Sequence, residues 1–164
     1  KAGGLTRYDG SDDNLLTTLV PSAAMTLAVK FVNSTAARVA IGASTTAPRN
    51  YLGISNLGGT IGGGIGDQNW DNIRSPSGDD RNNLIIGVLT ASAADGVRIY
   101  RNAVLVYAGA LVGTPAGSLP FRIGASNSGS GAAAFLFGDI YKALAIDRAL
   151  TPAEVLKLTN AWSH

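Results

Sequence analysis

The chain has 164 residues, of which 46% are hydrophobic, and its net charge at pH 7 is +2. This length suits one domain with a substantial core, and the longest apolar run, residues 84–94, is shorter than the roughly 18 residues of a membrane span. The basic residues are scattered rather than gathered into the continuous patch that nucleic-acid binding needs, and the absence of cysteine excludes disulfides and thiolate metal sites.

The proportion of charged residues is low, at 15%, against about 25% in an ordinary soluble domain. Two interpretations stay open. Either other subunits or domains cover part of the surface, as in a homo-oligomer, or the chain is a monomeric extracellular module. Since the sequence begins at Lys1 without a signal-peptide pattern, we also expect it to be a processed or excised piece.

Apolar residues alternate with period two in the first predicted strand, residues 25–32. The odd-numbered positions from Met25 to Phe31 are apolar and share one face, while Thr26 and Lys30 lie on the other. This pattern is typical of a half-buried antiparallel strand. A second strand is predicted over 38–42, where Val39 and Ile41 repeat the alternation on one face.

The next predicted strand, residues 83–90, is apolar on both faces. Leu84, Ile86 and Val88 alternate with Ile85 and Leu89, which is expected of a strand near the centre of a sandwich.

Four further strands are predicted after it. An Asp95-Gly96 turn supplies the positive φ of a tight hairpin, and the strands that follow are 97–102, 104–107, 121–125 and 135–146.

A single helix is predicted at the end of the chain. Residues 151–154 read Thr-Pro-Ala-Glu, which is a capping box with proline at the first helical position. Leu150, Val155 and Leu158 form an apolar stripe that should pack on the sandwich, and the helix should end near residue 161.

Short strands separated by Gly, Asn, Asp and Pro predict an all-β fold, an antiparallel β-sandwich or jelly roll. With no internal repeat and no linker, residues 1–164 are predicted to form one domain. The glycine-rich stretch 57–66 lacks the Lys-Ser/Thr of a phosphate loop. It is therefore interpreted as a strand pair in which two backbones approach closely.

Several segments resemble laminin G-like domains of the concanavalin A-like (pentraxin-like) superfamily. Residues 7–15 are similar to the opening strand of that family, 25–31 to its second strand, and 97–106 to its aromatic-x-Asn-Gly hairpin. Residues 137–140 and 146–155, Phe-Gly-Asp-Ile and Ile-Asp-Arg-Ala-Leu-Thr-Pro-Ala-Glu-Val, are similar to its closing strand and helix. The resemblance implies two sheets packed face to face and functions in glycan binding, adhesion or virion and secreted structures.

Two positions depart from the family pattern. Ala103 replaces the usual glycine of the hairpin, which disfavours a type I′ turn. Tyr141 and Lys142 stand where family members often carry acidic residues, which weakens an inherited calcium site.

The side chains needed for catalysis are scarce. Glycosidases with this fold resemble other retaining enzymes in needing two carboxylates about 5–5.5 Å apart, but the one glutamate, Glu154, is assigned to the helix cap. The one histidine, His164, is the last residue, so a Ser-His-Asp arrangement would depend on a frayed end. We therefore predict that the chain is not an enzyme.

The best candidate for carbohydrate binding is the polar segment around Trp70. In the functional interpretation Trp70 stacks on a sugar ring while Asp67, Asn69 and Asp71 bind hydroxyl groups or hold a calcium ion, with Arg74 just beyond. In the alternative, Trp70 belongs to the core or rim and the polar residues only build turns. Both interpretations stay open.

A second acidic cluster contains Asp9, Asp12 and Asp13. In the family that this chain resembles, the equivalent turn is mainly structural, with side chains bonded to the backbone. The candidate cofactor is calcium, and its weak candidate ligands are Asp67, Asp71, Asp9 and Asp12. Residues 79–81 are expected to form a solvated turn.

Two functions follow from these observations. The first is a non-catalytic carbohydrate-binding or adhesion module of a bacterial or phage surface protein. The alternative is a structural virion component, such as a tail-fibre or capsid-decoration domain, that acts through protein contacts. The expected partners are a glycan or neighbouring protein subunits, without nucleic acid or membrane insertion, and the expected location is extracellular or on a virion surface.

Overall fold

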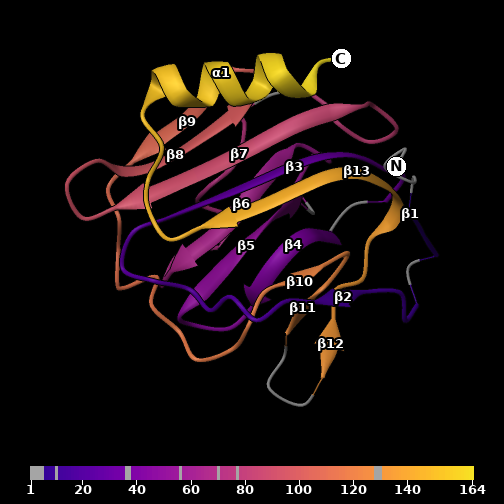
Figure 1. Ribbon diagram of the computed structural model, residues 1–164, viewed down its shortest axis with the longest axis horizontal. Coiled ribbons are helices and arrows are strands. Elements are labelled where there is room, and N and C mark those ends of the chain that lie inside the picture. Colours follow the sequence, from indigo (N-terminus) through magenta and orange to yellow (C-terminus); the bar gives the residue numbers. More distant parts are fainter. Residues whose placement is uncertain are drawn as a thin grey trace.

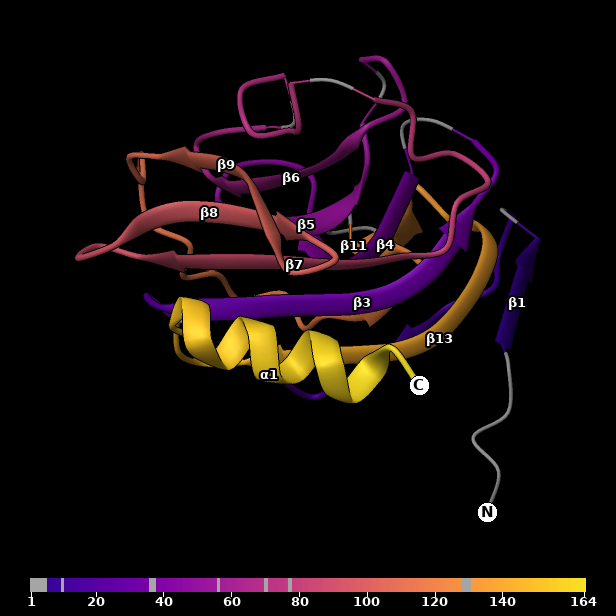
Figure 2. The same cartoon turned by 90° about the horizontal axis from the view of Figure 1, so that it is seen from above.

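The computed structural model describes residues 6–9, 11–35, 38–55, 57–69, 71–76, 78–127 and 131–164. They form two antiparallel sheets and a helix that lies on the outside of one of them (Figures 1 and 2). The six-stranded sheet has the order β1-β13-β3-β7-β8-β9 and the five-stranded sheet the order β2-β10-β4-β5-β6. The predicted all-β sandwich is therefore confirmed.

The strands of the six-stranded sheet are β1 (Thr6–Asp9), β3 (Met25–Asn33), β7 (Ile85–Ser92), β8 (Gly96–Arg101), β9 (Val104–Gly109) and β13 (Phe137–Ile146). Those of the five-stranded sheet are β2 (Leu15–Leu16), β4 (Arg38–Ser44), β5 (Arg49–Ile54), β6 (Ile61–Gly66) and β10 (Arg122–Ile123). A separate ribbon pairs β11 (Ser126–Asn127) with β12 (Ala132–Ala133). Among the described residues, no helix is long and apolar enough to span a membrane.

The alternation predicted for β3 is confirmed, but the strand is buried on both faces rather than half-buried. Its odd-numbered residues from Met25 to Phe31 join the core between the sheets. On the other face, Ala28 is fully buried in a second apolar cluster beneath the helix. The reason is tertiary, since the helix α1 (Pro152–Trp162) covers the outer face of the six-stranded sheet (Figure 2).

The strand β7 is internal and apolar on both faces, as predicted. Ile85 and Leu89 contribute to the core between the sheets, and Ile86 and Val88 to the cluster under α1. Leu84 was predicted to belong to the strand, but it precedes β7 and its side chain is exposed.

The prediction that Val39 and Ile41 share a face is wrong. The pairing of β4 with β5 shifts register between these two residues. As a result Ala40 and Ile41 both join the core between the sheets, whereas Val39 is buried outside that cluster. A bulge adds one residue to a strand and so breaks the period of two.

Three of the predicted segments differ from the strands that form. Residues 7–15 divide into β1 and β2, which belong to different sheets. The predicted strand 121–125 retains only β10, because Gly124 adopts a φ of +83° that ends it. The predicted strand 135–146 begins at Phe137, after Ala134 with a φ of +52°.

The β8–β9 hairpin contains a turn that Ala103 was expected to disfavour. The structure nevertheless holds Asn102 and Ala103 at φ values of +51° and +68°, the signs that a type I′ turn requires. Asn102 is fixed from both sides, since its N–H donates to the Ile86 carbonyl and its Oδ1 accepts from the Ile86 N–H, each at 2.9 Å. These bonds hold the turn without glycine.

The predicted turn at 79–81 is only partly solvated. Asp79 and Arg81 are exposed and paired with each other, but Asp80 is buried, with 2% of its surface exposed. Its carboxylate contacts the backbone of β6 and the side chain of Arg101. The expectation of a solvated turn is therefore wrong for Asp80.

The helix α1 begins with the predicted capping box. The Thr151 side chain accepts from the Glu154 N–H, and the Glu154 carboxylate accepts from the Thr151 N–H at 2.9 Å. At the other end, Lys30 donates to the Trp162 carbonyl at 2.5 Å. A cation at the C-terminal carbonyls of a helix interacts favourably with the helix dipole, so the sheet itself stabilises this end of α1.

Stability should depend on pH through Glu154. Its bond to the Arg148 guanidinium, and then its bonds to Thr151, lower the pKa of the Glu154 carboxyl from 4.5 to about 2. A carboxyl whose pKa is depressed by folding contributes stability above its unfolded pKa and loses it as the pH falls towards the folded value. We expect Glu154→Gln to lower the melting temperature at pH 5–7, and the difference from wild type to disappear by about pH 2. Thermal melts of both proteins across this range check it, and a constant difference would contradict it.

Candidate functional site

The segment after β6 adds a short edge to the five-stranded sheet. Gly63 N–H donates to the Ile73 carbonyl and Ser75 N–H to the Ile61 carbonyl, both at 2.9 Å. Ile73 is fully buried in the core between the sheets, which anchors the segment. Residues 71–76 are thereby held beside the edge of the sandwich.

A cavity of about 460 Å³, here called the edge cavity, lies between this segment and β9, the edge strand of the six-stranded sheet. It falls within the roughly 300–1,000 Å³ of typical small-molecule sites. Its lining residues are Asp71, Asn72, Arg74, Pro76, Val106, Tyr107 and Ala108. The edge cavity thus combines a carboxylate, an amide, a guanidinium and an aromatic ring.

Arg74 keeps unused hydrogen-bonding capacity. Its Nε is buried and has no hydrogen-bond partner, and its Nη1 is 3.5 Å from the carbonyl oxygen of Ser75, which is a long hydrogen bond. An unpaired buried donor costs about 1–3 kcal/mol. Because the long bond uses little of the Nη donor capacity, the guanidinium retains donors for the acceptor oxygen of a ligand in the edge cavity.

Tyr107 lines the edge cavity, and its side chain packs on the core between the sheets. Its hydroxyl group lies over Gly109, where an added Cβ would be only 2.5 Å from the hydroxyl oxygen. Tyr107 was not among the binding residues predicted from the sequence. No spacing along the chain links it to Arg74, because only the approach of two sheet edges brings them together.

The structure brings together two of the five predicted binding residues. Asp71 and Arg74 line the edge cavity. Asn69 builds the turn instead, since its Oδ1 accepts from the Asp71 N–H and its Nδ2 donates to Asp71 Oδ2, both at 3.1 Å. Asp67 lies away from the cavity beside Gly113, where an added Cβ would be 2.5 Å from its Oδ2. Trp70 lies outside the described residues.

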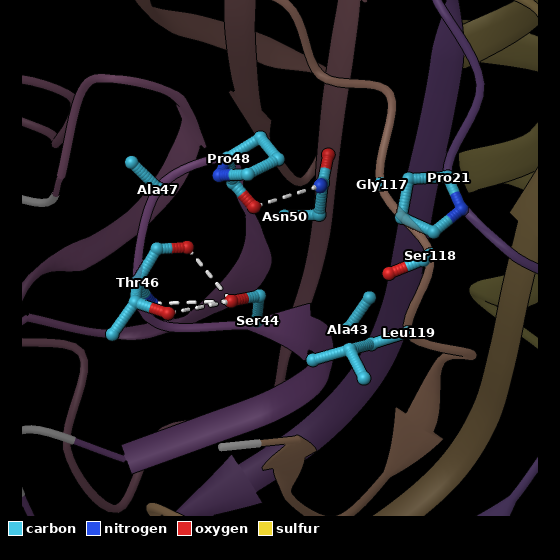
Figure 3. A pocket seen from close by; sticks show the side chains of 10 residues that line it. All are labelled: Pro21, Ala43, Ser44, Thr46, Ala47, Pro48, Asn50, Gly117, Ser118 and Leu119. Carbon is cyan, nitrogen blue, oxygen red and sulfur yellow. Dashed lines mark hydrogen bonds between the residues drawn. The ribbon is translucent and has the colours of Figure 1, made fainter. Parts of the chain in front are cut away.

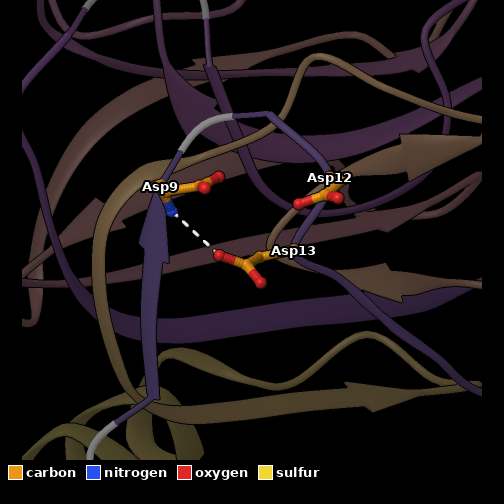
Figure 4. Close-up of side chains that lie close together, drawn as sticks. All are labelled: Asp9, Asp12 and Asp13. Atoms are coloured by element: carbon orange, nitrogen blue, oxygen red, sulfur yellow. Dashed lines mark hydrogen bonds between the residues drawn. The ribbon is translucent and has the colours of Figure 1, made fainter.

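The structure brings only some of the candidate calcium ligands close together. Among the described residues, the group of three acidic side chains close enough to share an ion is Asp9, Asp12 and Asp13, whose oxygens lie within 4.8 Å of one another (Figure 4). Asp67 and Asp71 belong to no such group within the part of the chain that the structure describes. Carboxylate oxygens are the ligands that calcium takes, so the donor type of the first cluster fits.

Hydrogen bonds already occupy part of this acidic cluster. Asp9 Oδ1 accepts from the N–H of Ser11 at 2.8 Å and from its hydroxyl at 2.6 Å, which lowers the pKa of the Asp9 carboxyl. Asp13 Oδ2 accepts from the Asp9 N–H at 3.1 Å (Figure 4). These bonds are those of a structural turn.

No protein-family model and no curated protein sequence matches the chain. Among solved structures, a heptameric SAP-like pentraxin from Limulus polyphemus is similar, with a TM-score of 0.70, 15% identity, and coverage of 94% of this chain and 81% of that one. The CBM40 of Ruminococcus gnavus IT-sialidase, solved with α2,3-sialyllactose bound, is also similar, with a TM-score of 0.68 and 12% identity. The match covers 97% of this chain and 99% of that one.

A third similar structure is the NanB sialidase from Streptococcus pneumoniae, with a TM-score of 0.66, 17% identity and coverage of 93% of this chain. The chain covers 27% of that sialidase, so there this fold is one part of a longer protein. Identities this low establish the fold alone. The predicted antiparallel β-sandwich is thus confirmed, and its fold is similar to that of the pentraxin.

Proposed function

We propose that this chain is a non-catalytic carbohydrate-binding module that holds a glycan in the edge cavity. The observation that carries the proposal is the meeting of Tyr107, Asp71 and Arg74 in one cavity of suitable size. Sugar recognition uses an aromatic face together with a few fixed polar groups. Tyr107 offers the ring, the Asp71 carboxylate accepts from hydroxyl groups, and Arg74 donates to ring, hydroxyl or carboxylate oxygens.

The structural likeness to the CBM40 of Ruminococcus gnavus supports the same proposal, since that module was solved with a sialylated sugar bound and the two chains cover each other almost completely. A non-catalytic role agrees with the use of the one glutamate, Glu154, in the helix cap. We place such a module on a bacterial or phage surface protein, outside the cell or on a virion, with calcium at the Asp9 cluster as its candidate cofactor.

A glycan-array screen of the purified chain tests the proposal, run with calcium and with chelator. We expect saturable binding that falls about tenfold or more in Arg74→Ala and in Tyr107→Ala, because each removes one wall of the edge cavity. Tyr141→Ala is the matched control, since Tyr141 is an exposed tyrosine on β13 that does not line the cavity. Binding that is unchanged in both cavity variants would place the glycan elsewhere.

The second candidate function is assembly with other subunits, as in a tail fibre or capsid decoration. It is favoured by apolar side chains on sheet edges, where Val104 of β9 is 64% exposed and Leu15 of β2 is 58% exposed. Exposed edges of this kind are templates for pairing with another chain. Light scattering on the array samples separates the two functions, because a stable oligomer that binds no glycan would favour assembly.

A further inference from the structure

A second cavity, of about 190 Å³, lies between the loop that joins β4 to β5 and the segment 117–119 (Figure 3). We refer to it as the hairpin cavity. Its lining residues are Pro21, Ala43, Ser44, Thr46, Ala47, Pro48, Asn50, Gly117, Ser118 and Leu119. None of these lines the edge cavity, so the two sites can be tested independently.

The hairpin cavity has a buried floor and an accessible rim. Pro21, Ala43 and Asn50 are buried, whereas Pro48 and Ser118 are exposed. The two proline rings give the walls a fixed shape, because their φ angles are locked. The cavity is thus open to solvent on one side and closed by buried side chains on the other.

Asn50 has a buried acceptor with no partner. Its Nδ2 donates to the Pro48 carbonyl at 3.3 Å, but its Oδ1 is buried and has no hydrogen-bond partner. The neighbouring hydroxyl of Ser44 differs, since it donates to the Thr46 carbonyl at 2.7 Å. Buried polar atoms in folded proteins are nearly always paired. Asn50 lines the cavity, so a small rotation of its side chain would present this acceptor to a donor from outside the chain.

The lining determines the chemistry of that donor. None of the described residues that line the cavity carries an ionisable side chain, so nothing among them would compensate a charged ligand. The volume greatly exceeds the roughly 10–15 Å³ that one water molecule needs, and it is smaller than the roughly 300–1,000 Å³ of sites for drug-sized ligands. The lining combines apolar proline and leucine side chains with hydroxyl and amide groups. A sugar has the same combination, since its ring has apolar C–H faces and its edge carries hydroxyl groups.

We propose that the hairpin cavity binds one neutral sugar residue or a polyol of similar size, which donates a hydroxyl group to Asn50 Oδ1. The site is additional to the edge cavity and does not rest on it. Because no charged side chain lines the hairpin cavity, binding there should not change with salt concentration, whereas binding at Asp71 and Arg74 should weaken as salt is added.

Gly117 offers a way to block the hairpin cavity without disturbing the fold. A Cβ added to it would lie 3.7 Å from Asn50 Nδ2 and 3.8 Å from the Cγ atoms of Pro21 and Pro48, which are ordinary contact distances. A leucine side chain at position 117 would therefore extend into the cavity. Ala116→Leu is the matched control, because it adds comparable bulk to an exposed neighbour that does not line the cavity.

The test is an NMR titration of the chain with glucose, N-acetylglucosamine, arabinose and glycerol. A second titration uses an oligosaccharide whose terminal residue is the sugar that binds with the highest affinity. We expect saturable shifts of the Asn50 side-chain amide and the backbone amides of Gly117 and Ser118. Affinity should fall about tenfold or more in Gly117→Leu and remain unchanged in Ala116→Leu. Ser118→Leu, on the exposed rim, is a second blocking variant if Gly117→Leu does not fold.

Two outcomes would overturn the inference. In one, no probe produces saturable shifts at these three residues, so that the cavity holds water only. In the other, the shifts persist in both blocking variants. A signal confined to Tyr107 and Arg74 would support the edge cavity and reject the hairpin cavity. A signal confined to Asn50, Gly117 and Ser118 would support the hairpin cavity and reject only the edge cavity.

Discussion

Replacing Asp80 with Ala should lower the free energy of unfolding by about 3 kcal/mol. The Asp80 side chain is 2% exposed, and its Oδ2 accepts from the Ile61 N–H at 2.6 Å at the start of β6. Its Oδ1 lies 2.5 Å from Arg101 Nε, as an ion pair without the alignment of a hydrogen bond. Alanine would leave a buried N–H unpaired and a guanidinium without its counter-charge. The carboxylate therefore joins the edge of one sheet to the end of β8 in the other.

Thermal melts of Asp80→Ala measure this effect, and about 3 kcal/mol corresponds to a loss of roughly 6–12 °C in a chain of this size. The control is Asp79→Ala in the same turn. Asp79 is exposed, and its bond to Arg81 lowers the pKa of its carboxyl to about 2, but exposed ion pairs contribute little to stability. If both variants melted alike, Asp80 would have no special structural role.

Replacing Gly63 with Val should also destabilise the sandwich, by about 2–3 kcal/mol. A Cβ at this position would lie 2.5 Å from Leu89 Cδ1 in the opposite sheet and 2.7 Å from the Tyr51 carbonyl oxygen on the neighbouring strand. Local preference points the other way, since valine favours strands and glycine weakens them. The sign of the effect thus distinguishes tertiary packing from strand propensity.

Chemical denaturation of Gly63→Val checks the size of the effect, with Gly117→Ala as a glycine substitution that meets no close neighbour. Adding Leu89→Ala to Gly63→Val removes one of the two clashing groups. The double variant should therefore lose less stability than the sum of the single variants. Strict additivity would show that the inter-sheet clash is not the cause.

The cavities and the buried carboxylate are features that depend on residues far apart in the chain. Arg74 and Tyr107 come from different sheets but line the same cavity. Asn50 and Gly117 are likewise far apart in the chain and together line the hairpin cavity. The binding site predicted around Trp70 rested on polar residues that are adjacent in sequence. Two of these adjacent residues stabilise a turn, since the Asn69 side-chain amide is hydrogen-bonded to Asp71. Local composition therefore cannot separate binding residues from turn residues.

By itself the sequence determined the elements whose signals are local. Alternation in β3, the apolar character of β7 and the capping box of α1 follow from neighbouring residues, because side-chain period and caps depend only on the local backbone. The tertiary structure alone decided the bulge that separates Val39 from Ile41, the burial of Asp80, and which polar groups face a cavity. These depend on how two sheets and their edges pack, and packing brings together residues whose separation along the chain carries no signal.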